Sequence, residues 1–266
     1  MSTIYSPLEK GFTASLHAID RCQVALLREI AGLSGLRMVL KGGMAMRASF
    51  GSLRLTKDMD FDRDTEATTL NSVRSMITRG MKSAAEQSRL RAVAIDFSKA
   101  TDVTLRARMV GETIAGHAVR FEVEVSGRRF PRRENRRMET VVPPSDYGMA
   151  PFPVHTYTHA MLAASKVLAV MSDNRNVPRD VYDLRDLIFA QANPVDILRG
   201  LPTEAVGYMR ADVVSKLALI TFDQAREELL PYLPPAIAAE IDQATWDAWT
   251  LDVAESIDGW FQEIGP

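Results

Sequence analysis

The first half of the chain mixes two patterns of apolar and polar residues, whereas the second half shows only one. Short apolar or alternating runs in the first half have the spacing of strands, at residues 38–40, 58–62, 92–97, 103–109, 119–125 and 138–142. Apolar residues three or four positions apart predict helices at residues 7–31, 44–50 and 69–89. The runs at 103–109 and 119–125 flank a segment that contains glycine, and together they predict a β-hairpin.

Four prolines between residues 143 and 153 interrupt this pattern, and the residues that follow have helical spacing almost throughout. The predicted helices are 157–171, 179–191, 203–217, 222–232, 235–243 and 248–261. We therefore predict an α+β fold in which an α/β domain, residues 1–150, precedes an all-helical domain, residues 151–266.

The composition is that of an ordinary globular protein, since 46% of the 266 residues are hydrophobic and 25% are charged. A formal net charge of -2 excludes binding of nucleic acid through overall charge, so any basic surface must be local. Cys22 is the only cysteine, which excludes an intrachain disulfide and a cysteine-based zinc site. The sequence shows no export pattern and no apolar run of membrane-spanning length, so we expect a cytoplasmic protein without a membrane partner.

The clearest chemistry lies in one short segment of the first half. Asp58 and Asp60 are two residues apart in a predicted strand, so both carboxylates point to one face while Met59 points to the core. Two carboxylates on one face repel each other unless a cation lies between them, and oxygen ligands of this kind suit Mg²⁺. Gly42 and Gly43 follow a short apolar run and precede a predicted helix, so the backbone can approach an anion there. The segment therefore predicts a metal site beside a phosphate site.

The same segment resembles the nucleotidyltransferases related to DNA polymerase β, in which a strand, a glycine pair and a helix precede Asp-x-Asp. The phrases LKGGMAM (residues 40–46) and RLTKDMDF (residues 54–61) are similar to LKGGTAL and R-x-S-x-D-L-D-F of the AbiEii/AbiGii toxin family. The resemblance implies a polymerase β-like core with a mixed sheet. It also implies that Asp58 and Asp60 bind Mg²⁺ or Mn²⁺ and that an NTP triphosphate is bound by Lys41, Gly42 and Gly43.

A third acid on a neighbouring strand usually completes a two-metal site. Glu122 and Glu124 are the candidates, because they share one face of the predicted strand at 119–125. The toxin family has an acid near the end of this strand, in a phrase similar to I-E-I-S, and Glu124 followed by Val125 and Ser126 fits it best. We expect Glu124 to be the catalytic metal ligand. The alternatives are Glu122 or a strand face that is merely solvated.

Six arginines follow this strand directly: Arg128, Arg129, Arg132, Arg133, Arg136 and Arg137. Guanidinium groups bind phosphate with bidentate geometry, so a run that leaves the active-site strand can hold a triphosphate or an RNA backbone. We predict that the first four arginines bind RNA. The alternative is an ordinary solvated face.

Lys166 lies in an otherwise apolar predicted helix. The toxin family has a lysine at the matching place, in a phrase similar to A-E-K-L-x-A-L, where it is expected to contact nucleotide phosphate; this chain has Ser165 in place of the usual glutamate. Residues 179–184, RDVYDL, resemble the family phrase R-D-L-Y-D-L and place Asp180 and Asp183 on one helix face. Either aspartate is a catalytic candidate that orients Lys166, and either can cap the helix. We expect the helical part to pack on the cleft and to supply Lys166.

The resemblance covers residues 37–61, 119–126 and 157–187 in the family's order. It implies a toxin of a type IV-like toxin–antitoxin system that moves a nucleoside monophosphate from an NTP to RNA, such as the 3′ end of tRNA. It also implies an antitoxin encoded nearby. Two alternatives remain, a small-molecule transferase of the aminoglycoside-modifying kind and a nucleotide- or protein-binding module without catalysis. The arginine run favours a polyanionic acceptor, and the set of acids favours catalysis.

Overall fold

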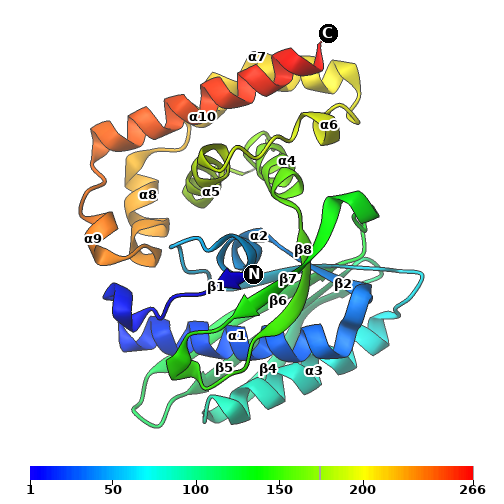
Figure 1. Cartoon of the computed structure of the whole chain (residues 1–266), viewed down its shortest axis with the longest axis vertical. Helices are drawn as coiled ribbons and strands as arrows, with labels where there is room; N and C mark the ends of the chain where they lie inside the picture. The colour runs from blue at the N-terminus through cyan, green and yellow to red at the C-terminus, as the bar shows by residue number, and fades with distance from the viewer. Residues whose placement is uncertain (174, 266) are drawn as a thin grey trace. The chain divides into compact units, whose positions relative to one another are not determined.

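The computed structural model describes residues 1–173 and 175–265 and divides into two compact units, the first of which is Met1–Tyr157. In Figure 1 the first unit runs from blue to green and the second from green to red. The division falls later than the predicted boundary between residues 150 and 151. The reason is that residues Phe152–Tyr157, which were predicted to open the helical part, form a strand of the first unit's sheet.

A mixed sheet, with eight strands among the described residues, forms the centre of the first unit (Figure 1). The strands are β1 (Ser2–Thr3), β2 (Met38–Lys41), β3 (Asp58–Arg63), β4 (Arg91–Thr101), β5 (Thr104–Glu112), β6 (Ala118–Ser126), β7 (Arg136–Val142) and β8 (Phe152–Tyr157). Their order is β1-β7-β8-β2-β3-β6-β5-β4. β3 lies between β2, which runs antiparallel to it, and β6, which runs parallel to it. The two strands that carry the predicted acids are therefore direct neighbours, and the predicted mixed sheet is confirmed.

Alternation along the central strands separates an apolar face of the sheet from a polar one. Met59, Val123 and Ala107 lie side by side across β3, β6 and β5, and all three are buried. Helices α1 (Ala14–Ser34) and α3 (Leu70–Gln87) pack on each other and on these strands (Figure 1). The polar neighbours of the three buried residues therefore lie on the opposite face.

Threonine caps determine where these two helices begin. The side chain of Thr13 accepts a hydrogen bond of 3.3 Å from the backbone N–H of Leu16, so α1 begins later than the predicted residue 7. The residues before it form a separate 3₁₀ turn, Leu8–Lys10. Thr69 and Ser72 form a reciprocal capping box at the start of α3, which lies where a helix was predicted.

A short helix, α2 (Gly42–Ala45), follows β2 without a loop and continues as a π-helical segment, Met46–Phe50. Gly51, with φ of +74°, ends the segment. A helix was predicted at residues 44–50, and the structure places helical backbone there, with the wider π geometry over its last turn.

Helices and the turns between them make up the described part of the second unit. The helices are α4 (His159–Val170), α5 (Pro178–Phe189), α6 (Val195–Leu198), α7 (Thr203–Ala218), α8 (Phe222–Glu228), α9 (Pro235–Ala238) and α10 (Gln243–Ile264). They share one apolar core, in which the indole N–H of the buried Trp246 donates to the carbonyl of Ile220 at 2.9 Å. The predicted all-helical part is confirmed over these residues. None of the described helices is long and apolar enough to cross a membrane.

Candidate functional site

The predicted acids meet on one face of the sheet. β3 and β6 pair in parallel, with Asp58 opposite Glu122 and Asp60 opposite Glu124. All four side chains are half-buried, whereas Met59 between the two aspartates is buried on the other face. Because residues opposite each other share a face, the carboxylates form two rows across the strands. The predicted shared face is confirmed, and the catalytic roles of these residues stay predictions.

Two arginines of β5, which the sequence reasoning missed, extend both rows. Arg106 lies opposite Glu124, and its Nη2 is 2.5 Å from Oε2 of that carboxylate. Arg108 lies opposite Glu122, and its Nε is 3.0 Å from Oε1. The hydrogen bond with Glu124 raises the pKa of Arg106 against the effect of burial, and the charges of Glu122 and Asp58 raise it further. Arg106 therefore lies within the field of three carboxylates. The signal in the sequence was the alternating Arg106 and Arg108 across the predicted hairpin from the two glutamates.

Gly42 and Gly43 bring the backbone close to β3. Gly42 has φ of +65°, and a Cβ there would lie 2.5 Å from Oδ2 of Asp60. A Cβ at Gly43 would lie 2.8 Å from Nη2 of Arg54 and 2.9 Å from Oγ1 of Thr56. Real Cβ atoms essentially never approach so closely, so a side chain at either position would force these neighbouring side chains to shift. The group that Gly42 approaches is a carboxylate of the candidate site, while the predicted approach to phosphate stays a prediction.

Asp62 is a third aspartate on the polar face of β3, beyond Asp58 and Asp60, and sequence reasoning did not select it. It is 3% exposed. Its Oδ1 lies 2.6 Å from Nζ of Lys41, and its Oδ2 accepts a hydrogen bond from the hydroxyl of Tyr157. Burial raises the pKa of Tyr157, and the charge of Asp62 raises it further, so the hydroxyl stays protonated and donates. Lys41, a predicted nucleotide-binding residue, is therefore held by a buried carboxylate.

The donor set fits a hard divalent cation in part. Asp58 and Asp60 offer carboxylate oxygens on one face, and Mg²⁺ is usually bound by one or two carboxylates together with substrate phosphates. The carboxylate of Glu124 is bonded to Arg106, which competes with a metal ion for the same oxygen. No group of three or more His, Cys, Asp or Glu side chains within residues 1–173 and 175–265 is arranged to hold a metal ion. Asp58 and Asp60 fit as ligands, and Glu124 has to leave Arg106 to join them.

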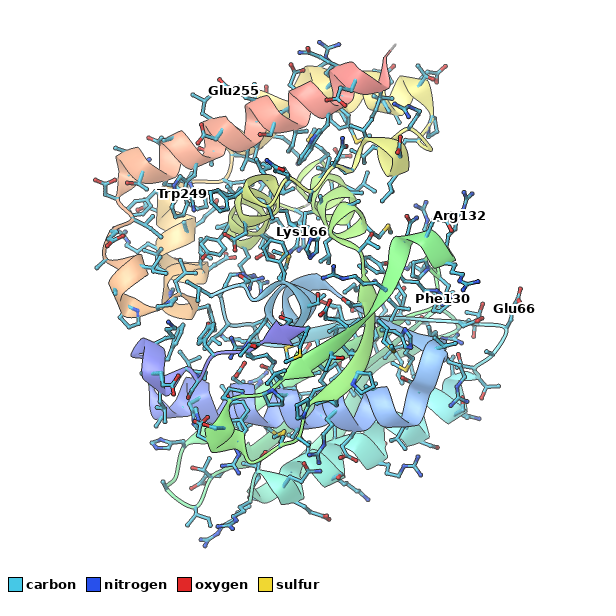
Figure 2. The ribbon with its side chains drawn as sticks, in the orientation of Figure 1. Glu66, Phe130, Arg132, Lys166, Trp249 and Glu255 are labelled. Carbon is cyan, nitrogen blue, oxygen red and sulfur yellow. The ribbon has the colours of Figure 1, made fainter. Side chains whose placement is uncertain are left out.

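The arginine run extends from the connection after β6 into the first two residues of β7. Its exposed members are the four predicted to bind RNA, Arg128, Arg129, Arg132 and Arg133. Figure 2 shows Arg132 pointing outward from this connection, near Phe130. Arg129 lies close enough to Tyr157 to lower the pKa of that hydroxyl, against the larger effect of burial. Arg136 stacks on the ring of Phe130 at 4.6 Å, and Nη2 of Arg137 donates to the carbonyl of Ser49 at 3.0 Å. The last two arginines therefore support the local structure, and the first four face solvent.

Lys166 of α4, labelled in Figure 2, contacts Asp180 and Asp183 of α5 inside the second unit. The Nζ of Lys166 lies 2.7 Å from Oδ1 of Asp180 and 2.6 Å from Oδ2 of Asp183. Lys166 is 7% exposed, and both aspartates are fully buried. Burial acts to raise the pKa of Asp180, but Lys166 and Arg175 outweigh it and lower that pKa to about 2. Both candidate aspartates therefore orient the same lysine. The predicted contact of Lys166 with nucleotide phosphate stays a prediction.

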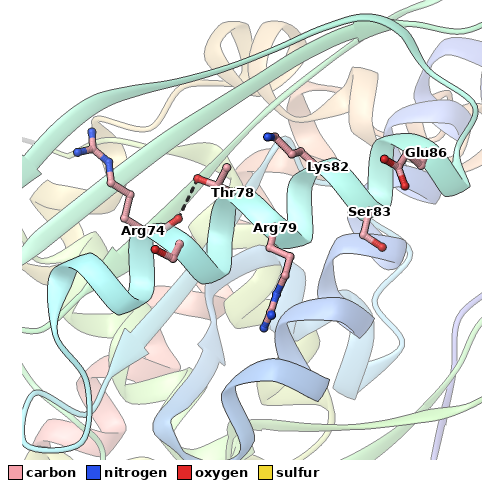
Figure 3. A pocket seen from close by; sticks show the side chains of 7 residues that line it. Arg74, Thr78, Arg79, Lys82, Ser83 and Glu86 are labelled. Carbon is pink, nitrogen blue, oxygen red and sulfur yellow. Dashed lines mark hydrogen bonds between the residues drawn. The ribbon is translucent and has the colours of Figure 1, made fainter.

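A pocket of about 650 Å³ on α3 lies elsewhere in the first unit (Figure 3). Its lining residues are Arg74, Ser75, Thr78, Arg79, Lys82, Ser83 and Glu86. The guanidinium of Arg74 also lies 4.4 Å from the ring centre of Phe97 on β4. Phe97 pairs with the buried Ala107, so α3 and this pocket are on the apolar side of the sheet. The pocket is therefore separate from the face that carries Asp58 and Asp60.

Comparisons with known proteins identify the family of the chain. A family model described as "Nucleotidyl transferase AbiEii toxin, Type IV TA system" matches residues 25–259, whereas no curated protein matches the chain.

Three solved structures are similar in fold. JHP933 from Helicobacter pylori is 15% identical with a TM-score of 0.63, and the match covers 95% of both chains. A candidate nucleotidyltransferase from the same organism is 16% identical with a TM-score of 0.65, and the match covers 96% of this chain and 100% of the other. MenT4, a nucleotidyltransferase toxin from Mycobacterium tuberculosis, is 15% identical with a TM-score of 0.54, over 97% and 87% of the two chains. At these identities the structures support the fold alone, while the family model spans most of the sequence. The chain therefore belongs to the AbiEii family of nucleotidyltransferase toxins from type IV toxin–antitoxin systems.

Proposed function

We propose that this toxin transfers a nucleoside monophosphate from an NTP to a hydroxyl group of RNA, and that it requires Mg²⁺ or Mn²⁺. The observation that carries the proposal is the pair of carboxylate rows on β3 and β6, beside the turn at Gly42. Family membership supports an NTP as the substrate and an antitoxin, encoded nearby, as the partner.

The acids have distinct proposed roles. Asp58 and Asp60 are the proposed metal ligands, because they present two carboxylates on one half-buried face. A bound metal ion would neutralise charge on the phosphates and lower the pKa of the acceptor hydroxyl. Glu124 is the proposed third ligand. Its partner Arg106 is 42% exposed, so exchange of that ion pair for another partner costs little free energy.

The proposed reaction is a direct displacement at phosphorus. The acceptor oxygen forms a bond to the α-phosphorus, and the bond from that phosphorus to the bridging oxygen breaks. Pyrophosphate leaves with the electron pair of the broken bond, and the hydroxyl proton passes to a carboxylate of β6 or to water. Lys41, Gly42 and Gly43 are proposed to hold the β- and γ-phosphates.

The proposed acceptor is RNA, with the 3′ end of tRNA as the specific candidate. Four exposed arginines support a polyanion, since they follow directly after the strand of Glu124. Arginine binds phosphate oxygens with bidentate geometry, and several such contacts can bind successive phosphates of a nucleic-acid backbone.

The test is transfer of label from each of the four NTPs to total RNA in the presence of Mg²⁺. Asp58→Asn and Asp60→Asn should each lower the rate at least about 100-fold, because each removes a proposed metal ligand. Circular dichroism checks that each variant stays folded. Asp212→Asn is the matched control, since it removes an exposed carboxylate from α7 of the second unit, and it should leave the rate unchanged.

Near-normal transfer by Asp60→Asn would contradict the mechanism. If label enters a small molecule such as an aminoglycoside and never RNA, the acceptor is a small molecule and the proposed RNA acceptor is wrong. Wild-type protein that labels nothing with any NTP would contradict the function itself.

A further inference from the structure

The surroundings of Asp62 differ from those of Asp58 and Asp60, although the three residues share one face of β3. Both oxygens of Asp62 are engaged, one by the ammonium of Lys41 and the other by the hydroxyl of Tyr157. A metal ion bound by Asp62 would displace that ammonium and leave it partly buried without its counter-charge. The geometry therefore argues against Asp62 as a metal ligand.

Lys41 lies on the same face as two carboxylates of β3, those of Asp60 and Asp62, and its ammonium is bonded to Asp62. The β2–β3 register places Lys41 directly opposite Asp60, on the same face. Its ammonium nevertheless lies against Asp62, two residues further along β3. The Lys41 side chain remains 26% exposed, so a ligand can reach it. Asp62 thus fixes a positive charge next to a proposed metal ligand.

Three neighbouring strands hold this cluster in register. Lys41 is the last residue of β2, Tyr157 is the last residue of β8, and Asp62 lies in β3. β2 pairs with β3 over its whole length and with β8 at Leu40 and Thr156. The residue after Lys41 is Gly42, whose turn into α2 also restricts the backbone. The Lys41 side chain is therefore held at its backbone end by the strand and the turn, and at its ammonium end by Asp62.

We propose that Asp62 is a positioning residue that holds the Lys41 ammonium where it binds the terminal phosphates of the NTP, and that Tyr157 secures the second oxygen of Asp62. The inference rests on the proposed function and deepens it, because Asp62 contacts neither metal nor substrate and acts through Lys41. An unrestrained lysine loses considerable side-chain entropy when it binds a phosphate, and a fixed one loses less.

A second buried aspartate in the same unit provides a matched control. Asp20 of α1 is bound by Arg47, through bonds of 2.5 and 2.7 Å, and by the hydroxyl of Tyr147. Arg47 is fully buried, so no ligand can reach it. Each cluster contains an aspartate, a cation and a tyrosine, but only the cation of the Asp62 cluster is accessible to a ligand. If Asp62 were merely structural, its variants would behave like those of Asp20.

The experiment measures binding separately from transfer, on the full chain. Asp62→Asn, Tyr157→Phe and Lys41→Met are compared with the controls Asp20→Asn and Tyr147→Phe. Electron paramagnetic resonance follows Mn²⁺ binding, calorimetry gives the affinity for a non-hydrolysable NTP analogue with Mg²⁺, and thermal melting reports the fold.

Asp62→Asn should weaken analogue binding about 10-fold and leave Mn²⁺ affinity within about 2-fold of wild type. Tyr157→Phe should weaken analogue binding about 3-fold, and it keeps the proposal testable if Asp62→Asn does not fold. A combined Lys41→Met and Asp62→Asn variant should bind no more weakly than Lys41→Met alone, because Asp62 acts through Lys41. The controls should lower the melting temperature without changing analogue affinity.

Loss of Mn²⁺ binding in Asp62→Asn would make Asp62 a metal ligand and overturn the proposal. Unchanged analogue affinity in both Asp62→Asn and Tyr157→Phe would overturn it too, as would wild-type protein that binds no analogue. Wild-type protein that binds the analogue but transfers nothing to RNA would instead remove the proposed function and leave the role of Asp62 standing.

Discussion

Two charge clusters, one in each unit, use the same chemical groups in opposite surroundings. On the sheet of the first unit, Arg106 and Glu124 are 42% and 31% exposed. In the second unit, the side chains of Lys166 and Asp183 are 8% and 0% exposed. Water screens the attraction between the exposed groups, whereas each buried charge depends on its partner. The comparison indicates that the first cluster can exchange partners, as a metal site requires, and that the second has a fixed arrangement.

The comparison is tested most strongly by replacing the cation of each cluster with methionine. Lys166→Met should lower the free energy of unfolding by about 3–5 kcal/mol, because it leaves Asp180 and Asp183 buried with less counter-charge. Arg106→Met should lower it by less than about 1 kcal/mol. Urea unfolding followed by circular dichroism measures both. Equal losses of unfolding free energy in the two variants would show that the difference in exposure does not make the clusters differ in strength.

Acid should weaken the buried cluster through protonation of Asp180. The pKa of Asp180 is lowered from 3.8 to about 2, so its folded state binds protons less readily than its unfolded state. The stabilisation is therefore fully present above about pH 5, and it is lost as the pH falls through 4 towards 2; it amounts to about 2 kcal/mol. Melting temperatures of wild type and Asp180→Asn from pH 6 to pH 2.5 should converge. Parallel pH profiles of the two proteins would contradict this assignment.

Replacement of the exposed arginines should have the smallest effect on stability. Its effect should be on RNA binding. Replacing Arg128, Arg129, Arg132 and Arg133 with serine should leave unfolding nearly unchanged. It should weaken RNA binding and reduce its salt slope by up to about 3, because each lost phosphate contact removes about 0.7 from the slope for single strands. Filter binding at several salt concentrations gives the slope.

A control with equal loss of charge replaces four exposed cations on α3 and the start of β4: Arg74, Arg79, Lys82 and Arg91. The slope should change less in this variant. An equal change in both variants would mean that RNA binding follows overall charge and not the connection between β6 and β7.

Local patterns in the sequence were sufficient to predict features that depend on a single strand, such as the face on which a side chain lies. Alternation alone placed Asp58 and Asp60 on one face and Met59 in the core, as the structure has them. Strand β8 was missed because its Pro153 looked like a break. The structure tolerates this proline, since Pro153 lies opposite Thr140 of β7 while β2 joins β8 only through Thr156.

Relations between distant segments could not be predicted. The partnership of Arg106 with Glu124 depends on the register of a hairpin, and a shift of one residue would reverse the faces. The burial of Asp62 depends on Tyr157, 95 residues later in the chain. A lone aspartate after Asp-x-Asp gives no sign of such a partner.

Gly42 makes the site sensitive to volume as well as to charge. A methyl group at this residue would collide with Oδ2 of Asp60, and the backbone would also have to keep a φ of +65°. Gly42→Ala would therefore disturb the carboxylate while the net charge of the chain stays at -2. In a growing culture, such an allele would separate damage caused by the reaction from damage caused by electrostatic binding to polyanions. Asparagine substitutions of the aspartates change both properties together, so the glycine is the cleaner genetic tool.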